Sequence, residues 1–190
     1  MENQIKKTNW QSFWELARFA LIAIIIVIPI RMFVAQPFIV SGSSMVPTFQ
    51  DGQYLVVDEL SYLIGSPNRG DVVVFRNPKD TKIFFIKRII GLPGETVDVK
   101  SDINEVTITN KENPSGFKLD QSFIVNTGGI DGHMALGANE YFVMGDNRPA
   151  SSDSRYWGVV PKNLMIGKAF LRLLPINKIA YHPGSFNLIK

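Results

Sequence analysis

Residues 71–90 read DVVVFRNPKDTKIFFIKRII and consist of two runs of β-branched and aromatic residues around a turn former, Asn77-Pro78. These runs, Asp71–Arg76 and Ile83–Ile90, predict two β-strands. Similar short runs, broken by Gly, Pro, Asn and Asp, continue on both sides. They are Phe38–Val40, Gln53–Val57, Thr96–Val99, Val106–Thr109, Tyr141–Met144 and Met165–Leu174. Many short strands at close spacing predict an all-β fold with antiparallel sheets.

Residues 98–138 are the most polar part of this region and contain Asn113-Pro114-Ser115-Gly116 and Gly128-Gly129. Such turn-rich sequence favours loops over long strands. We therefore predict an antiparallel β-sheet core with a smaller inserted β/loop lobe at 98–138, and we expect this lobe to carry little chemistry.

The second run of the opening stretch places one cation on each face of a strand. With a period of two, Lys87 shares a face with Ile83, Phe85 and Ile89, and Arg88 lies on the other face. We expect the strand to be well buried, and burial lowers the pKa of a lysine from about 10.4. A neutral lysine can accept a proton from a serine hydroxyl. The strand alone still favours an ordinary interpretation, in which both cations extend to solvent or pair with carboxylates.

Two further segments are rich in small polar residues. Residues 41–48, SGSSMVPT, follow a β run, and a tight turn there would expose the Ser44 hydroxyl and free backbone N–H groups for an oxyanion. Alone, this pattern is more often a plain loop, and it lacks the second glycine of G-x-S-x-G. Residues 145–158, GDNRPASSDSRYWG, also follow a strand. A serine of this segment can orient the Lys87 amine, and an Asp–Arg pair can lock the loop.

The composition excludes several other kinds of site. The chain has no cysteine, and its two histidines, His133 and His182, are too few for a multi-histidine metal centre. The net charge of +3 is spread among interspersed charges, which is typical of an ordinary solvated surface and not of a nucleic-acid site. A Ser-His-Asp triad would need a histidine that lies near no strong motif. Ser115 and Lys118 match S-x-x-K formally, but within a Pro/Gly loop.

The most apolar stretch is Phe19–Ile30, FALIAIIIVIPI, which has no charge. Extended to Phe38 it reaches 20 residues with one charge, Arg31, which is close to the length of a membrane span. We predict an uncleaved transmembrane anchor at 16–36. A buried soluble helix is the first alternative, but the stretch is apolar all round. A cleaved secretory signal is the second, but Phe33 is too large for an A-x-A site before Ala35.

The basic residues Lys6, Lys7 and Arg18 favour a cytoplasmic N-terminus. We therefore expect a cytoplasmic tail at 1–15 and an extracytoplasmic catalytic domain at 37–190, in a single-pass protein of the cell membrane.

Taken together, these segments resemble bacterial type I signal peptidases, which are Ser/Lys endopeptidases. The similar boxes occur in the family's order, at Ser44–Thr48, Arg69–Phe75, Lys87–Glu95 and Gly145–Gly158. The resemblance implies Ser44 as nucleophile and Lys87 as general base in the removal of signal peptides. It implies exported preproteins with small residues at −1 and −3 as substrates and the lipid bilayer as a partner. It implies no cofactor, no metal and no nucleic acid.

The resemblance also implies roles for other residues. The lysine-orienting hydroxyl would be Ser151, and the supporting residues would be Asp153, Arg155, Asp146 and Arg148. The backbone N–H of Ser44 would serve the oxyanion hole, to which Gly42 adds no side-chain donor. The substrate-binding residues would be Phe38, Val40, Gly42, Met45, Phe85 and Ile86.

Two other functions are compatible with the same boxes. A Ser/Lys self-cleaving regulator shares a Ser-Met-x-Pro box, but the N-terminal anchor and the lack of a DNA-binding segment count against it. A catalytically silent, membrane-bound binding protein is the other alternative, and the presence of both Ser44 and Lys87 counts against it.

Overall fold

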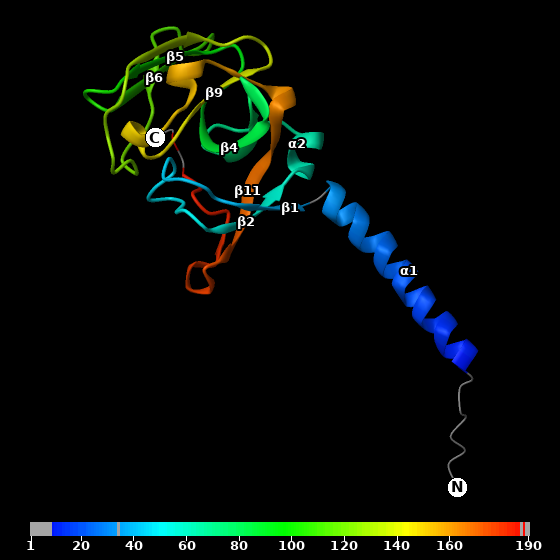
Figure 1. Cartoon of the computed structure of the whole chain (residues 1–190). Coiled ribbons are helices and arrows are strands. Elements are labelled where there is room, and N and C mark those ends of the chain that lie inside the picture. The colour runs from blue at the N-terminus through cyan, green and yellow to red at the C-terminus, as the bar shows by residue number, and fades with distance from the viewer. Residues whose placement is uncertain (1–8, 34, 187, 189–190) are drawn as a thin grey trace.

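Helix α1 (Asn9–Phe33) leads away from a body built of β-strands (Figure 1). The computed structural model describes residues 9–33, 35–186 and 188. Large apolar side chains of α1, among them Leu16, Phe19 and Ile25, are exposed. Within these described residues, no helix combines the length and the apolarity needed to cross a membrane. The predicted anchor at 16–36 is therefore not confirmed, and Lys6 and Lys7, which bear on its orientation, lie outside the described residues.

The larger sheet is antiparallel and contains eight strands in the order β1-β2-β11-β3-β4-β9-β10, with β12 also paired to β11. Their bounds are β1 Ala35–Ile39, β2 Tyr54–Asp58, β3 Val72–Asn77, β4 Asp80–Gly91, β9 Glu140–Met144, β10 Val160–Pro161, β11 Met165–Leu174 and β12 Ala180–Tyr181. The two strands predicted from residues 71–90 pair with each other, and Val73 lies opposite Lys87. The prediction of an all-β fold with antiparallel sheets is confirmed.

The burial of strand β4 changes along its length. Residues 80–84 are exposed, whereas residues 87–91 are buried. The reason is the pairing of the sheet, because β9 pairs with β4 only from Arg88 to Gly91. The expectation that the whole strand is buried was therefore wrong for its first half, which borders the open side of the sheet next to Lys87.

A second antiparallel sheet of four strands, in the order β7-β6-β5-β8, lies beside the first (Figure 1). Its strands are β5 Thr96–Lys100, β6 Glu105–Thr109, β7 Phe117–Lys118 and β8 Gly132–Ala135. The two sheets share one apolar cluster, in which Ile90 and Phe142 of the large sheet pack with Val97, Val106 and Ile108 of the small one. This shared core holds the small sheet against the end of β4 that follows Lys87.

Short helical turns connect the strands. They are α2 Leu60–Ile64, η1 Arg148–Ala150, α3 Ser154–Trp157, η2 Lys162–Leu164 and η3 Ile176–Lys178. Two of them, η1 and α3, belong to the polar segment 145–158. Helix α3 begins after Asp153, whose carboxylate accepts a hydrogen bond from the Arg155 N–H, as is typical of an N-cap aspartate.

Candidate active site

Ser44 lies in a turn that is anchored to the core on its far side. Met45 and Phe49 are 1% and 0% exposed and pack in one cluster with Leu55 and Val72, and the Phe49 N–H donates to the Met45 carbonyl. Ser44 itself is only half-buried. The turn therefore packs its apolar side chains into the core and leaves the serine hydroxyl on its partly exposed side.

The Lys87 amine meets this hydroxyl. Its Nζ lies 2.7 Å from Ser44 Oγ and 3.0 Å from the Ile86 carbonyl oxygen, and Lys87 is 4% exposed. Burial lowers the pKa of Lys87 from 10.5 to about 8, against the opposing effect of the Asp153 and Asp146 carboxylates. A buried amine in hydrogen-bond contact with a hydroxyl has the geometry of a base next to a nucleophile.

The neighbouring cation, Arg88, lies on the other face of β4 and has a different environment. It is fully buried and forms a bidentate pair with Asp146, with Nε–Oδ1 and Nη2–Oδ2 distances of 2.8 and 2.6 Å. The Thr48 hydroxyl donates to the same carboxylate at 2.5 Å. Asp146 therefore joins three segments, those of Thr48, Arg88 and Gly145. The ion-pair partner of Asp146 is Arg88, which follows Lys87 on strand β4.

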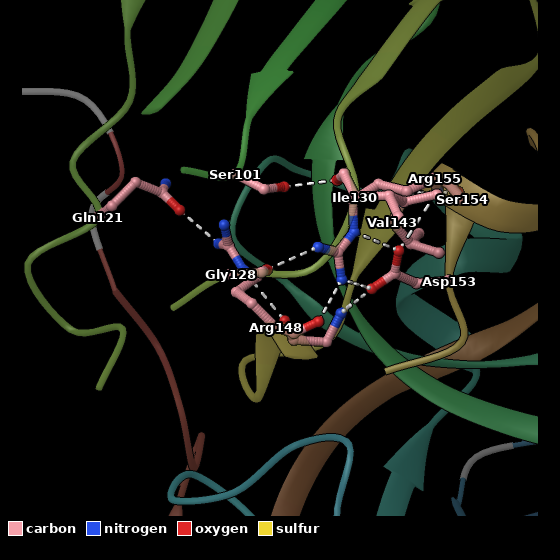
Figure 2. Close-up of polar contacts among 10 residues, drawn as sticks. Ser101, Gln121, Gly128, Ile130, Val143, Arg148, Asp153, Ser154 and Arg155 are labelled. Carbon is pink, nitrogen blue, oxygen red and sulfur yellow. Dashed lines mark hydrogen bonds and ion pairs between the residues drawn. The ribbon is translucent and has the colours of Figure 1, made fainter. Parts of the chain in front are cut away.

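Segment 145–158 is held by a second pair, shown in Figure 2. Arg155 Nε and Nη2 each lie 2.9 Å from a carboxylate oxygen of Asp153, and both side chains of the pair are fully buried. The Asp153 carboxylate also accepts from the Gly145 N–H at 3.0 Å. Arg148 is 2% exposed, and its Nε donates to the Gly145 carbonyl at 3.1 Å. These contacts fix the start of the segment next to Ser44.

Gly145 is the point where the segment touches the serine turn. A Cβ at this position would lie 2.4 Å from the Ser44 carbonyl oxygen and 2.3 Å from Ser151 Oγ, so only glycine fits. Beside it, the Asn147 backbone N–H donates to the Ser44 carbonyl and the Asn147 amide to the Ser43 carbonyl, each at 3.0 Å. Asn147 of the polar segment thus fixes the carbonyl groups of Ser43 and Ser44.

Ser151 is close to these groups but does not make the contact that was expected. It is 3% exposed, and its Oγ has no hydrogen-bond partner within the described part of the chain. The expected hydrogen bond from the Lys87 amine to Ser151 is therefore absent here. Lys87 Nζ donates instead to the Ile86 carbonyl of its own strand.

A pocket of about 300 Å³ opens beside Ser44 and Lys87 and is mainly apolar. Five of the six expected substrate-binding residues line it, namely Phe38, Val40, Gly42, Phe85 and Ile86. Met45, the sixth, lies beneath the serine turn in the core and is not among the lining residues. The pocket also has lining residues that were not expected, namely Ile39, Ser41, Ser43, Leu55, Val74, Phe84, Ala150 and Ser152.

Two residues of the site, Phe84 and Asn147, were not predicted, although the sequence around each of them indicates its role. Phe84 lies on the opposite face of β4 from Phe85, but the strand is exposed there and both rings reach the pocket, where Phe84 packs edge to face on Phe38. Asn147 lies inside the quoted polar segment, and an amide directly after a glycine and an aspartate is a common means of fixing a neighbouring turn.

The histidines take no part in this arrangement. His133 is an exposed residue of β8 that pairs with Asp98 of the small sheet, and His182 packs on Phe170 and Tyr181. Among the described residues, no hydrogen bond joins either histidine side chain to Ser44. Nor do the described residues hold a group of three or more His, Cys, Asp or Glu that could bind a metal ion.

A serine hydroxyl, a buried amine and an adjacent apolar pocket lie together on an all-β scaffold, and comparison with known proteins shows the family to which the chain belongs. A family model for "Signal peptidase, peptidase S26" matches residues 13–174. The chain belongs to this signal peptidase family.

Related proteins are similar over most of the chain. Signal peptidase I of Bacillus amyloliquefaciens is 36% identical over 93% of this chain and 92% of its own length. A Synechocystis protein described as "Probable signal peptidase I-2" is 38% identical over 92% of this chain and 79% of its own. A solved structure of a signal peptidase I from Enterococcus faecalis is 30% identical and covers 54% of this chain and 95% of its own, at a TM-score of 0.45.

Proposed function

We propose that this chain removes N-terminal signal peptides from exported preproteins, with Ser44 as the nucleophile and Lys87 as the general base. The observation that carries the proposal is the 2.7 Å contact between the Lys87 amine and the Ser44 hydroxyl next to an apolar pocket. Signal peptidase relatives that are 36–38% identical supply the substrate class.

The first chemical step is a proton transfer. Burial lowers the pKa of Lys87 to about 8, so about a tenth of the amine is neutral at pH 7 and can accept the Ser44 proton, and this fraction rises with pH. As the proton moves to Nζ, Ser44 Oγ attacks the scissile carbonyl carbon and forms a tetrahedral intermediate. The Lys87 ammonium then returns the proton to the leaving amine, which leaves an acyl group on Ser44. A water molecule, deprotonated by the same amine, releases the acyl group and restores the serine.

The oxyanion of the intermediate needs a donor that is not already used. Among the described residues, no backbone or side-chain hydrogen bond employs the Ser44 N–H as donor, whereas the Gly42 N–H donates to the Asp51 carboxylate at 2.7 Å. The Ser44 N–H is therefore free to serve as the backbone donor for the oxyanion, and Gly42 serves to shape the turn at a φ of +89°.

The pocket determines which residues fit on the acyl side of the cleaved bond. The pocket has a volume of about 300 Å³, and Val40, Phe85 and Ile86 form its walls close to the reacting groups. Bulky branched and aromatic walls leave room for small side chains, which agrees with preproteins that carry small residues at −1 and −3. Phe38 and Phe84, farther along β1 and β4, form an aromatic wall that the substrate backbone would pass.

We also propose that α1 belongs to a single-pass anchor at 16–36 that holds the catalytic domain at the outer face of the cell membrane. The support is the apolar surface of α1, which is spread around the helix and includes Leu16, Phe19 and Ile25, each more than half exposed. An exposed apolar surface of this extent marks a site of contact with a membrane or a protein. The basic Lys6, Lys7 and Arg18 favour an N-terminus on the cytoplasmic side.

The proposal is tested with purified full-length protein in detergent and a preprotein that carries an A-x-A cleavage site. The wild type is expected to cut after this site, and Ser44→Ala is expected to be inactive with unchanged folding. Lys87→Arg keeps a cation of similar length that is never deprotonated, so its activity should fall by at least about 100-fold. Cleavage by Ser44→Ala, or full activity of Lys87→Arg, would reject the assigned roles.

A further inference from the structure

The inserted lobe reaches the polar segment through two buried arginines (Figure 2). Residues 119–131, here called the lobe loop, connect β7 to β8 of the small sheet. The Gln121 amide oxygen accepts a hydrogen bond from Arg148 Nη2, and the Asn126 carbonyl accepts one from the Arg148 backbone N–H. The Gly128 carbonyl accepts from Arg155 Nη1 at 3.2 Å. Three points of one loop are thus tied to segment 145–158.

The same two arginines hold the residues that touch Ser44. Arg148 Nε donates to the Gly145 carbonyl, and Arg155 Nη2 donates to the Arg148 carbonyl at 2.6 Å. Gly145 contacts the Ser44 carbonyl oxygen, to which the Asn147 N–H donates. An unbroken series of hydrogen bonds and contacts therefore runs from the lobe loop to the serine turn.

Arg148 depends on the lobe loop more than Arg155 does. Arg155 has the Asp153 carboxylate as its partner, whereas Arg148 forms no ion pair in the part of the chain that the structure describes. Its side chain has two acceptors there, the Gly145 carbonyl and the Gln121 amide oxygen. Burial and the nearby Arg155 lower the pKa of Arg148 to about 10, against the opposing effect of the Asp146 and Asp153 carboxylates. Among the described residues, the Gln121 oxygen is the one side-chain acceptor that hydrogen-bonds this guanidinium.

We propose that Gln121 is a positioning residue for the Ser44–Lys87 reaction, acting through Arg148 on the Gly145–Asn147 backbone. The inference rests on the proposed function, because it assumes that Lys87 is the base. It assigns a role to the inserted lobe, for which little chemistry was expected from the sequence.

Loss of the Gln121 acceptor has two consequences. The guanidinium of Arg148 becomes free to leave the Gly145 carbonyl, so the segment that contacts Ser44 loses its fixed position, and small misplacements of a reacting group lower the rate by about 10- to 100-fold. The loosened η1 turn also admits water to Lys87. The charged groups that act on Lys87 are the carboxylates of Asp153 and Asp146, which are on the same segment and already favour its protonated form. Hydration removes part of the effect of burial and therefore raises the pKa of Lys87 above its value in the wild type.

The test uses full-length protein in detergent, a preprotein with an A-x-A site, and three substitutions of Gln121. Gln121→Met removes the acceptor at similar length, Gln121→Asn withdraws it by one methylene, and Gln121→Glu retains an acceptor oxygen. We expect Met and Asn to lower kcat by at least about tenfold with KM within about twofold, and to move the acid limb of the pH profile upward. We expect Glu to stay within about threefold of the wild-type kcat.

The matched control is Ser101→Ala, which removes a different anchor of the same loop. The Ser101 hydroxyl donates to the Ile130 carbonyl at 2.5 Å and does not contact Arg148 or Arg155 (Figure 2). This variant should lose stability but keep the wild-type pH profile and kcat.

The inference is overturned by either of two results. One is a wild-type kcat and pH profile in Gln121→Asn or Gln121→Met. The other is an equal loss of kcat in Ser101→Ala, which would show a general effect of lobe stability. Either result, obtained with an active wild type and inactive Ser44→Ala, leaves the proposed function intact. An inactive wild type would instead reject the proposed function itself.

Discussion

Replacement of Lys87 by methionine should remove activity and stabilise the folded protein at neutral pH. The physical reason is that the amine is 4% exposed, so its charged form is poorly solvated in the folded state. Methionine has a similar length and fills the same space without a charge. A residue that is costly to stability and needed for activity is expected at a catalytic position.

The magnitude follows from the pKa. Burial lowers the pKa of Lys87 from 10.5 to about 8, and each pKa unit corresponds to about 1.4 kcal/mol, so charged Lys87 costs the folded state about 3 kcal/mol. Between pH 8 and about 10.5 the unfolded chain binds a proton that the folded protein has released, so wild-type stability rises with pH over this range. Loss of the hydrogen bonds to Ser44 and to the Ile86 carbonyl costs the variant about 2 kcal/mol. Lys87→Met should therefore be about 1 kcal/mol more stable at pH 7.

The assay is urea-induced unfolding of both proteins, followed by circular dichroism at pH 7 and at pH 10.5. The gain of Lys87→Met should be present at pH 7 and should disappear at pH 10.5, where the lysine is neutral in the folded protein and about half of it is neutral in the unfolded chain. A variant that is less stable than the wild type at pH 7, or one whose gain is the same at both pH values, would refute the claim that Lys87 is held in a desolvated site.

Three further predictions concern the surrounding structure. Asp146→Asn leaves the fully buried Arg88 without its carboxylate and should lower the free energy of unfolding by about 3–5 kcal/mol in a denaturant titration; a change below about 1 kcal/mol would contradict the buried pair. Val40→Phe places a larger side chain in the pocket wall and should raise KM for an A-x-A preprotein by about tenfold, and because Val40 is 5% exposed and packs in the core it should also lower the free energy of unfolding by about 1–3 kcal/mol; an unaltered KM would exclude Val40 from the substrate site. Protease added to intact spheroplasts should digest the domain after residue 37 and spare the first residues of the chain, and protection of the large domain would reverse the proposed orientation.

The strands could be predicted from the sequence because their signals are local. Runs such as Asp71–Arg76 alternate with turn formers, and this is enough to locate six of the eight strands of the large sheet, all but the two-residue β10 and β12, and to infer antiparallel pairing. The short strands β7 and β8, of two and four residues, carry too little pattern to stand out from the polar loop around them. Their existence depends on pairing with β6 and β5.

The site could be predicted only in part, because its contacts join distant residues. Ser44 and Lys87 are 43 positions apart, and neither segment alone indicates that the hydroxyl and the amine meet. Resemblance to a known family supplied that pairing. It did not supply the acceptor that Arg148 finds in Gln121, which lies 27 positions earlier in a loop with no recognisable motif. It also led to a hydrogen bond between Lys87 and Ser151 that is absent from the part of the chain that the structure describes.

Activation of Ser44 by a neutral Lys87 predicts a specific pH dependence of kcat/KM on a preprotein with an A-x-A site. This parameter reports the ionisation of the free enzyme. Activity should fall as pH decreases through a single ionisation with a pKa of about 8, and the profile should be unchanged when His133 and His182 are both replaced by alanine. A limb near about 6.5 that disappears in the histidine variant, or a rate independent of pH between 6 and 9, would exclude Lys87 as the general base.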